Sequence, residues 1–152
     1  MGMGGSKCMV PSDIELLKRS FIEYLKHFEG TPYIWGGDDF SGFDCSGLSV
    51  EVLKSIGLIA RKADYTADGL RKLFEKYVVP TPYEGCLVFF MRNGTAYHIE
   101  IAINKYQTIG ASGGSSSVKT VQDAIKQNAF IKRRPIPQSL ELVFIDPFKA
   151  FI

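Results

Sequence analysis

Three cysteines and two histidines are the side chains of this sequence that could support nucleophilic catalysis. The cysteines lie at positions 8, 45 and 86, and the histidines at positions 27 and 98. An odd number of cysteines with no CxxC pair argues against a closed disulfide framework, and two histidines make a zinc site improbable. We therefore expect no metal and no cofactor. At least one thiol is free, and a free thiol becomes a nucleophile only beside a base.

Cys45 has the most favourable sequence context of the three thiols. A loop rich in glycine and aromatic residues, 31–44, precedes it, and apolar residues at helical spacing follow it over 48–56. Asp44 is a good helix N-cap residue, so Cys45 is expected in the first turn of a helix. The unpaired N–H groups of a helix N-terminus favour a thiolate. The small residues Ser46 and Gly47 are expected to leave room for a substrate backbone. The alternative is a buried cysteine that serves as a small apolar residue.

The other two thiols are expected to be inert. Cys86 lies within an apolar run, Gly85–Met91, that is typical of a buried strand. Cys8 lies in a glycine-rich N-terminal segment and is interpreted as an incidental exposed thiol. Cys45 is therefore the candidate nucleophile.

His98 is the candidate base. It lies in a segment, 97–104, in which apolar and polar residues alternate as in a half-buried strand. Residues 97, 99, 101 and 103 form the apolar face, and His98 and Glu100 lie on the other face. His27 lies in the last turn of a predicted helix, where an imidazole suits the helix dipole, so it is a weaker candidate.

Composition and length indicate one globular domain. The chain has 152 residues, of which 45% are hydrophobic and 22% charged, and its formal net charge is +2. We interpret residues 1–11 as a flexible lead-in and residues 12–152 as a single catalytic domain. A charge this small predicts no nucleic-acid partner, and the basic run 132–134 is interpreted as a solvated face. No segment has the length of a membrane span, and no signal peptide is visible.

The order of the predicted elements is typical of an α+β fold, because helices come first and antiparallel strands follow. Ser12 and Glu15 form a predicted capping box for the first helix, and Asn93-Gly94 predicts a hairpin turn. The Gly/Ser-rich segment 110–117 is expected to be mobile, and the apolar C-terminal segment 140–152 is expected to pack on the body. The predicted helices are 14–28, 45–56, 66–77 and 118–128, and the predicted strands are 85–91, 97–104, 105–109 and 129–136.

Three segments together resemble the NlpC-type cell-wall cysteine peptidases. The first combines Pro32-Tyr-Ile-Trp-Gly-Gly37 with Gly42-Phe-Asp-Cys-Ser-Gly-Leu48, and it is long and specific. The second, Gly85-Cys-Leu-Val-Phe-Phe90, and the third, His98-Ile-Glu-Ile-Ala-Ile103, are short but occur in the family's order. The resemblance runs from about residue 31 to residue 112.

The resemblance implies a papain-like core, with a nucleophile helix packed on an antiparallel sheet. It places Cys45 at the nucleophile, His98 at the base and Tyr33 at a tyrosine that lines the cleft and helps to stabilise the oxyanion. A structural role is favoured for Trp35. The implied reaction is hydrolysis of amide bonds in peptidoglycan stem peptides, often between γ-D-glutamate and diaminopimelate. The implied partner is therefore a cell-wall peptide.

Three positions depart from the family pattern. Gly110 stands where a third polar residue usually orients the catalytic histidine, and it has no side chain to do so. Glu100 stands where the family has glycine, and Cys86 stands where it has aspartate. Glu100 could orient His98 or could face solvent. Gln107, Ser112, a backbone carbonyl or a water molecule are further possibilities for the orienting group.

The missing third residue leaves two rival interpretations open. One is a degenerate, non-catalytic cleft that binds cell-wall peptides, and the other is a thiol amidase or acyltransferase that acts on another substrate. An enzyme with weakened or altered histidine orientation is favoured, because a thiolate–imidazolium pair depends less on such a residue than a serine triad does. The place of action is expected to be the cell wall, for example as a phage lysis or tail-associated enzyme or a secreted effector. The oligomeric state is left open.

Overall fold

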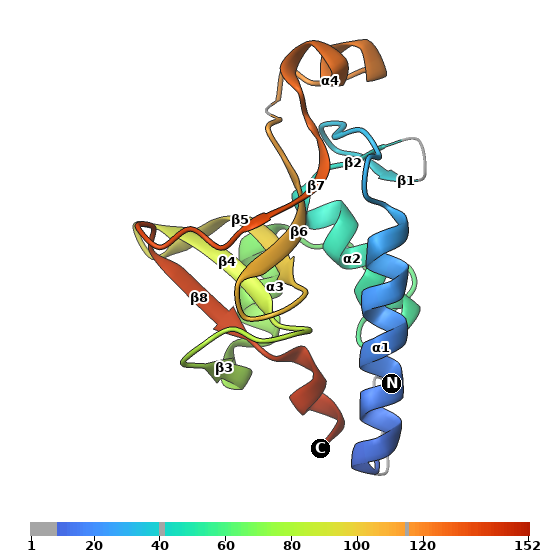
Figure 1. Cartoon of the computed structure of the whole chain (residues 1–152), viewed down its shortest axis with the longest axis vertical. Coiled ribbons are helices and arrows are strands. Elements are labelled where there is room, and N and C mark those ends of the chain that lie inside the picture. Colours follow the sequence, from blue (N-terminus) through green and yellow to red (C-terminus); the bar gives the residue numbers. More distant parts are fainter. Residues whose placement is uncertain (1–8, 40–41, 115) are drawn as a thin grey trace.

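The computed structural model of the protein describes residues 9–39, 42–114 and 116–152. A six-stranded antiparallel sheet packs against α2 and α3, and α1 packs on α2 (Figure 1). This architecture confirms the predicted α+β class. The helices are α1 (Pro11–His27), α2 (Cys45–Ser55), α3 (Ala67–Leu73), α4 (Val121–Gln127) and the 3-10 helices η1 (Glu75–Tyr77) and η2 (Pro147–Phe151). The strands are β1 (Asp38–Asp39), β2 (Gly42–Phe43), β3 (Val78–Val79), β4 (Leu87–Arg92), β5 (Thr95–Ala102), β6 (Gln107–Ser112), β7 (Phe130–Pro135) and β8 (Leu142–Ile145).

The main sheet has the strand order β3-β8-β4-β5-β6-β7. Strands β4 and β5 form the predicted hairpin, and Asn93 and Gly94 at its turn both have positive φ, 53° and 77°. A type I′ turn needs positive φ at both central residues, and Asn-Gly meets this need. The predicted packing of the C-terminal segment is confirmed, since β8 is inserted between β3 and β4.

Both faces of the sheet are buried at residues 87–90 of β4 and 99–102 of β5, which explains the apolar sequence of these segments. On the helix side, Phe89, Ile99 and Ile101 belong to the main hydrophobic core. On the opposite side, Phe90 and Ala102 belong to a second, smaller cluster. The face of β5 that the sequence predicted to be polar is therefore covered by apolar side chains near Ala102 and is open only toward His98.

The first helix begins differently from the sequence prediction. Val10 is its N-cap residue, Pro11 occupies the first turn, and no side chain caps the helix. The predicted capping box of Ser12 and Glu15 is therefore wrong. Proline is favoured at this position because it has no N–H that needs an acceptor and its φ is already helical. The chain is attached to the body from Met9, whose N–H donates to the carbonyl of Phe151.

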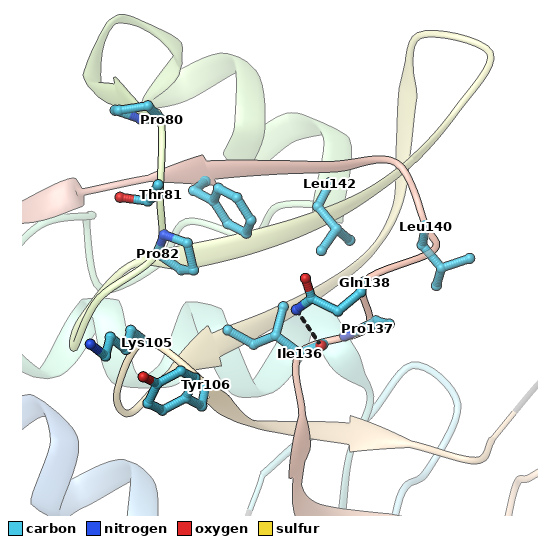
Figure 2. Close-up of a pocket in the computed structure, with 11 residues that line it drawn as sticks. Pro80, Thr81, Pro82, Lys105, Tyr106, Ile136, Pro137, Gln138, Leu140 and Leu142 are labelled. Atoms are coloured by element: carbon cyan, nitrogen blue, oxygen red, sulfur yellow. Dashed lines mark hydrogen bonds between the residues drawn. The ribbon is translucent and has the colours of Figure 1, made fainter.

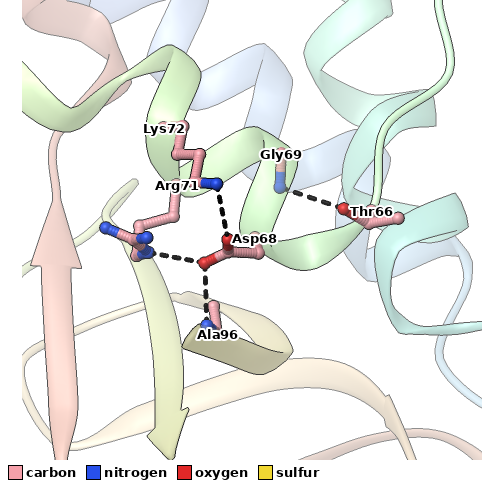
Figure 3. A network of polar contacts seen from close by, with 6 residues as sticks. All are labelled: Thr66, Asp68, Gly69, Arg71, Lys72 and Ala96. Atoms are coloured by element: carbon pink, nitrogen blue, oxygen red, sulfur yellow. Dashed lines mark hydrogen bonds and ion pairs between the residues drawn. The ribbon is translucent and has the colours of Figure 1, made fainter. Parts of the chain in front are cut away.

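An ion cluster on α3 fixes the start of β5, the strand that carries His98 (Figure 3). The carboxylate of Asp68 accepts hydrogen bonds from the Ala96 N–H at 2.8 Å and from Arg71 Nε at 2.8 Å. Lys72 Nζ adds an ion pair at 3.4 Å. These donors, first of all the Ala96 amide, lower the pKa of Asp68 to about 2. Because the carboxylate stays ionised, α3 holds the N-terminal end of β5 in register.

The segment expected to be mobile is partly a buried strand. Gly110, Ala111 and Ser112 lie in β6 and pair with β7. Their small side chains suit a strand that is covered on both sides. In the described ranges, no helix is long and apolar enough to cross a membrane, and no three His, Cys, Asp or Glu side chains gather as a metal site.

Candidate active site

Cys45 is the first residue of α2, as predicted. Asp44 is the N-cap residue, and its Oδ1 accepts a hydrogen bond from the Gly47 N–H at 2.7 Å. Its Oδ2 accepts from the Gly36 N–H at 3.0 Å, so one carboxylate fixes both the helix start and the preceding loop. The first N–H groups of a helix have no intrahelical acceptor and carry partial positive charge. The fold therefore presents the sulfur of Cys45 beside a positively polarised helix end.

The small residue Gly47 is needed for the packing of the protein's own loop. A Cβ on Gly47 would overlap the backbone carbonyl oxygen of Gly37. The same carbonyl accepts a hydrogen bond from the Asp44 N–H at 3.1 Å. The side on which a Gly47 side chain would lie is thus filled by the protein's own loop. Ser46 and Gly47 also line a hollow of about 280 Å³, and the expected room for a substrate backbone beside them stays a prediction.

A cleft of about 320 Å³ brings Cys45 and His98 together. Tyr33 and Trp35 from the aromatic loop line one part, and residues 111–114 from the end of β6 line another. The His98 ring also packs edge-to-face on Phe90, with 4.9 Å between ring centroids. Three segments far apart in the sequence therefore form one cleft around a thiol and an imidazole.

The carboxylate of Glu100 lies behind His98 and is completely enclosed. Its Oε2 is 2.7 Å from His98 Nε2 and 2.6 Å from Arg134 Nη2. Its Oε1 accepts from Thr108 Oγ1 at 2.6 Å and from Arg134 Nε at 3.0 Å. The residue is 1% exposed, so the solvent-facing alternative for Glu100 is wrong. Four short polar contacts compensate the burial of this charge.

The pKa values of this pair favour the charged forms of both residues. Burial opposes a charge on His98, but its interactions with Cys45 and Glu100 outweigh burial and raise its pKa to about 9. Burial would also raise the pKa of Glu100, but the hydrogen bonds from His98, Arg134 and Thr108 outweigh it and lower that pKa. At neutral pH the imidazolium and the carboxylate therefore persist together.

Gly110 provides the space that Glu100 occupies. A Cβ on Gly110 would overlap Cγ of Glu100 and lie 2.9 Å from its Cβ and Cδ. Any other residue at position 110 would therefore push the Glu100 side chain out of place. The two departures from the family pattern, glycine at 110 and glutamate at 100, are two halves of one arrangement.

Tyr33 is a buried wall of the cleft. Its backbone N–H donates to the Ala129 carbonyl at 2.9 Å, and a Cβ on Gly114 would overlap its ring. Burial, together with the nearby charges of Cys45 and Asp44, raises the pKa of Tyr33 to about 12. The phenol therefore stays protonated and can donate a hydrogen bond in the cleft.

Comparison with known proteins now places the chain in a family. The model of the NlpC/P60 family matches residues 30–134. This match covers more than half of the chain and includes every cleft residue described above. The chain belongs to the NlpC/P60 family. The resemblance noted in the sequence is confirmed.

Curated NlpC/P60 relatives include larger proteins. Protein P54 of Enterococcus faecium is 34% identical over 90 residues, which is 59% of this chain and 17% of that protein. The probable endopeptidase p60 of Listeria grayi is 31% identical over 102 residues, 66% of this chain and 19% of that protein. A γ-D-glutamyl-L-lysine dipeptidyl-peptidase of Bacillus cereus is 29% identical over 100 residues, 63% of this chain and 29% of that protein. The chain therefore aligns with less than a third of the length of each of these relatives.

Solved structures show the NlpC/P60 fold independently. The peptidoglycan hydrolase RipB of Mycobacterium tuberculosis superposes with a TM-score of 0.65 at 19% identity, over 90% of this chain and 67% of that one. The NlpC/P60 domain of the peptidoglycan hydrolase SagA superposes with a TM-score of 0.57 at 23% identity, over 83% and 96%. The predicted papain-like core is therefore confirmed at the level of fold.

Several other sequence candidates lie outside this NlpC/P60 cleft. His27 is exposed at the end of α1, and Gln107 contacts Asn104 near the β5–β6 turn. Cys86 is completely buried in the second apolar cluster, as expected. Cys8 lies outside the described residues. Ser112 does line the cleft, but Glu100 is the side chain that contacts His98.

Sequence reasoning missed three residues of the cleft. Trp35, for which a structural role was favoured, is 55% exposed and lines the cleft. Tyr97, predicted on the core face, is 43% exposed and lies under the Arg92 guanidinium, because a register shift after Phe90 breaks the alternation. Arg134 was interpreted as one of three solvated basic residues. Arg134 lies opposite Thr108 in the β6–β7 pairing, and this pairing is the signal that could have located Arg134 beside Glu100.

The basic run does not form a continuous charged patch. Arg134 binds Glu100, Arg133 pairs with Glu29 at 2.9 Å, and Lys132 donates to the Asn128 carbonyl at 2.9 Å. Successive residues of β7 point to opposite faces, which separates the three charges.

A larger hollow of about 650 Å³ lies elsewhere, between the β5–β6 turn and the segment that leads into β8 (Figure 2). It contains none of the predicted site residues. Proline and aliphatic side chains form much of its wall, and Lys105 is its one ionisable cation in the described part of the chain. The predicted residues Cys45 and His98 line the smaller cleft instead.

Proposed function

We propose that the chain is a cysteine peptidase that hydrolyses amide bonds in the stem peptides of peptidoglycan. The observation that carries this proposal is the shared cleft of Cys45 and His98, with Cys45 at a helix N-terminus and His98 backed by a buried carboxylate. Family membership supports the same reaction class, since the curated relatives include an endopeptidase and a dipeptidyl-peptidase.

In the proposed reaction, the Cys45 thiolate attacks the carbonyl carbon of the scissile amide and forms a C–S bond. The negative charge that develops on the carbonyl oxygen is stabilised by the Cys45 N–H and the Tyr33 hydroxyl. The His98 imidazolium gives its proton to the amide nitrogen as the C–N bond breaks, and the amine leaves. Neutral His98 then takes a proton from water, and the hydroxide attacks the thioester and releases the acid and Cys45.

Glu100 is the proposed positioning residue for His98. Its contact with Nε2 leaves Nδ1 as the ring nitrogen directed to the thiol, and its charge stabilises the imidazolium. This is the work that a third polar residue on the next strand does elsewhere in the family. Gly110 was the argument for a degenerate, non-catalytic cleft. That argument loses its force when Gly110 is the space that Glu100 requires.

The proposed scissile bond is the one between γ-D-glutamate and the following diamino acid, diaminopimelate or lysine. The resemblance to the NlpC-type peptidases implies this bond, and one relative carries γ-D-glutamyl-L-lysine in its name. The proposed place of action is accordingly the cell wall.

The test is digestion of purified peptidoglycan, with mass spectrometry of the released fragments. The unmodified chain is expected to release fragments cut after γ-D-glutamate. Cys45→Ala is expected to release none, while Cys86→Ala, the matched control at the other described thiol, releases the same fragments as the unmodified chain. Equal release by Cys45→Ala and the unmodified chain would overturn the proposal.

The two rival functions give different results in the same experiment. A degenerate cleft would bind stem peptides without releasing fragments in any variant. A thiol amidase or acyltransferase with another substrate would leave peptidoglycan intact, yet Cys45 would still react with an alkylating agent. Neither result is expected.

A further inference from the structure

Arg134 lines the catalytic cleft, and one edge of its guanidinium group is not used by any described residue. Its Nε and Nη2 both bind the Glu100 carboxylate, at 3.0 and 2.6 Å. In the described ranges, Nη1 has no hydrogen-bond partner. The side chain is 37% exposed and lines the same cleft as Cys45 and His98. An arginine can bind one carboxylate with each edge of its planar group.

The unused edge is held rigidly. The two-point contact with Glu100 fixes the plane of the guanidinium, and the Phe90 ring lies 5.2 Å from its central carbon. Thr108 holds the other side of Glu100. A ligand that binds Nη1 therefore does not have to restrict a flexible side chain, which is the main entropic cost of binding to surface arginines.

The charges around the cleft favour an anion. Among its described lining residues there is no aspartate or glutamate, whereas Arg134 and His98 are both basic. Among the residues that the structure describes, the carboxylate in contact with these two side chains is that of Glu100, which is buried and already holds four polar contacts. A peptide carboxylate that enters the cleft meets a fixed cation and no competing anion.

We infer that Arg134 is a specificity-determining residue that binds a free carboxylate of the stem peptide next to the scissile amide. This inference rests on the proposed function and names a chemical feature of its substrate. Arg134 is separated from the His98 imidazole by the Glu100 carboxylate alone, so the group it reaches belongs to a residue that flanks the scissile bond. Two carboxylates fit this description: the α-carboxylate of the γ-linked D-glutamate and a carboxylate of the following diamino acid.

The consequence is discrimination between acid and amide forms of the same peptide. A carboxamide has the shape of a carboxylate but not its charge, and it offers Nη1 a neutral acceptor. Charge-assisted hydrogen bonds are stronger than neutral ones by enough to change affinity by about tenfold or more. The chain is therefore expected to prefer stem peptides with free carboxylates over amidated peptides.

The test uses three synthetic peptides, L-Ala-γ-D-Glu-L-Lys and two forms of it, each amidated at one of the two carboxylates. The unmodified chain is expected to lose about tenfold or more in kcat/KM when one particular carboxylate is amidated, which identifies the group bound. In Arg134→Gln the acid and amide forms are expected to be cleaved at equal rates. A fall in the kcat of Arg134→Gln on all three peptides measures the loss of the contact between Arg134 and Glu100. The loss of discrimination between acid and amide forms measures the loss of the contact with the substrate.

Two further variants serve as controls. Arg133→Gln, on the opposite face of β7, is expected to keep the full discrimination. Arg134→Lys keeps the positive charge but loses the planar guanidinium group that can bind two carboxylates at once. This variant is expected to discriminate less between the acid and amide peptides. Arg134→Lys also replaces Arg134→Gln if the latter does not fold.

Binding of the same peptides to Cys45→Ala separates this inference from the proposed function. Carboxylate-dependent binding that disappears with Arg134→Gln or weakens with Arg134→Lys supports the inference, even if the unmodified chain cleaves none of the peptides. The inference is overturned if amidation at neither position changes kcat/KM or binding. It is also overturned if the discrimination survives intact in both Arg134 variants.

Discussion

The two described thiols of this protein lie in opposite electrostatic environments. Cys45 is partly exposed at a helix N-terminus, and the group facing it is the His98 imidazole, whose pKa is raised to about 9. Cys86 is completely buried and lies among Tyr83, Lys18 and the carboxylate of Asp146. Burial, with a smaller effect from Asp146, raises the pKa of Cys86 to about 11. The same side chain is thus paired with a cation in one region and kept neutral in the other.

In both regions a carboxylate comes from an unexpected place in the sequence. At Cys45, the proposed positioning residue Glu100 lies on the histidine's own strand, whereas the resemblance leads one to expect a residue of the next strand. At Cys86, where the resemblance leads one to expect aspartate, Asp146 after β8 accepts a hydrogen bond from Tyr83 and another from the Phe148 N–H. The position of a carboxylate in space matters more than its position in the sequence, because neighbouring antiparallel strands offer several routes to one point.

The largest contrast is expected in alkylation by iodoacetamide at pH 6.5. Cys45 should be modified, because it is partly exposed at the N-terminus of α2 and shares its cleft with the His98 imidazole, and modification should abolish peptidoglycan hydrolysis. Cys86 should remain unmodified, because it is buried and its pKa is about 11. Peptide mapping by mass spectrometry measures the extent of labelling at each cysteine.

A Cys8→Ser background removes the third thiol from this measurement. Denaturation in urea before labelling at high pH provides the positive control, because both remaining cysteines should then react equally. Labelling of Cys86 in the folded protein at a rate similar to that of Cys45 would contradict the contrast.

The second prediction concerns Glu100→Gln, which removes the charge behind His98 but keeps the shape. We expect kcat to fall by about 10²- to 10⁴-fold, by analogy with loss of the orienting carboxylate in a serine triad. Glu100 contributes to the raised pKa of His98, so the imidazolium of the variant should lose its proton at a lower pH. Activity of the unmodified chain should decline as pH rises through about 9. The decline in the variant should begin at lower pH, and a pH–rate profile measures this shift.

A purely structural role for Glu100 predicts a different outcome. Activity would then fall in proportion to the folded fraction, and the upper limb of the pH profile would stay in place. Circular dichroism of both proteins gives the folded fraction for this comparison.

A smaller loss of activity is expected for Gly110→Ala. The added methyl group overlaps Glu100 and must displace its side chain from His98, since the backbone of β6 is held by pairing with β7. We expect kcat to fall by about tenfold to a hundredfold, as is typical when a catalytic group is displaced by a fraction of an ångström to one ångström. Ile109→Val, at a neighbouring position of β6 and outside the cleft lining, tests whether any change in this strand has the same effect, and we expect it to keep most of the activity.

The sequence was sufficient for those parts of the fold and site that depend on local signals. Asp44 before an apolar helical stripe located the start of α2, and Asn93-Gly94 located the hairpin turn that sets the register of β5. Each signal works because the backbone geometry needs that residue type at that position. The position of Cys45 follows directly from the first signal, and the second places His98 on the strand that follows the turn.

The remaining features depend on contacts between distant strands. The burial of Glu100 depends on Arg134, Thr108 and the absence of a side chain at Gly110, which come from β6 and β7. Alternation within β5 alone could not distinguish a buried glutamate from a solvent-facing one. The exposure of Tyr97 likewise follows from a register shift with β4. Such features require the strand pairing as well as the order of the residues.

The smallest effect is expected for Cys86→Ala, the counterpart of the changes around Cys45. The substitution removes one buried sulfur atom from the second apolar cluster, and the free energy of unfolding should fall by about 1 kcal/mol. Peptidoglycan hydrolysis at 25 °C should be unchanged, because Cys86 lies outside the catalytic cleft. Urea denaturation measures the first effect and the digestion assay the second. A loss of hydrolysis in a fully folded Cys86→Ala variant would mean that the two thiol regions are functionally coupled.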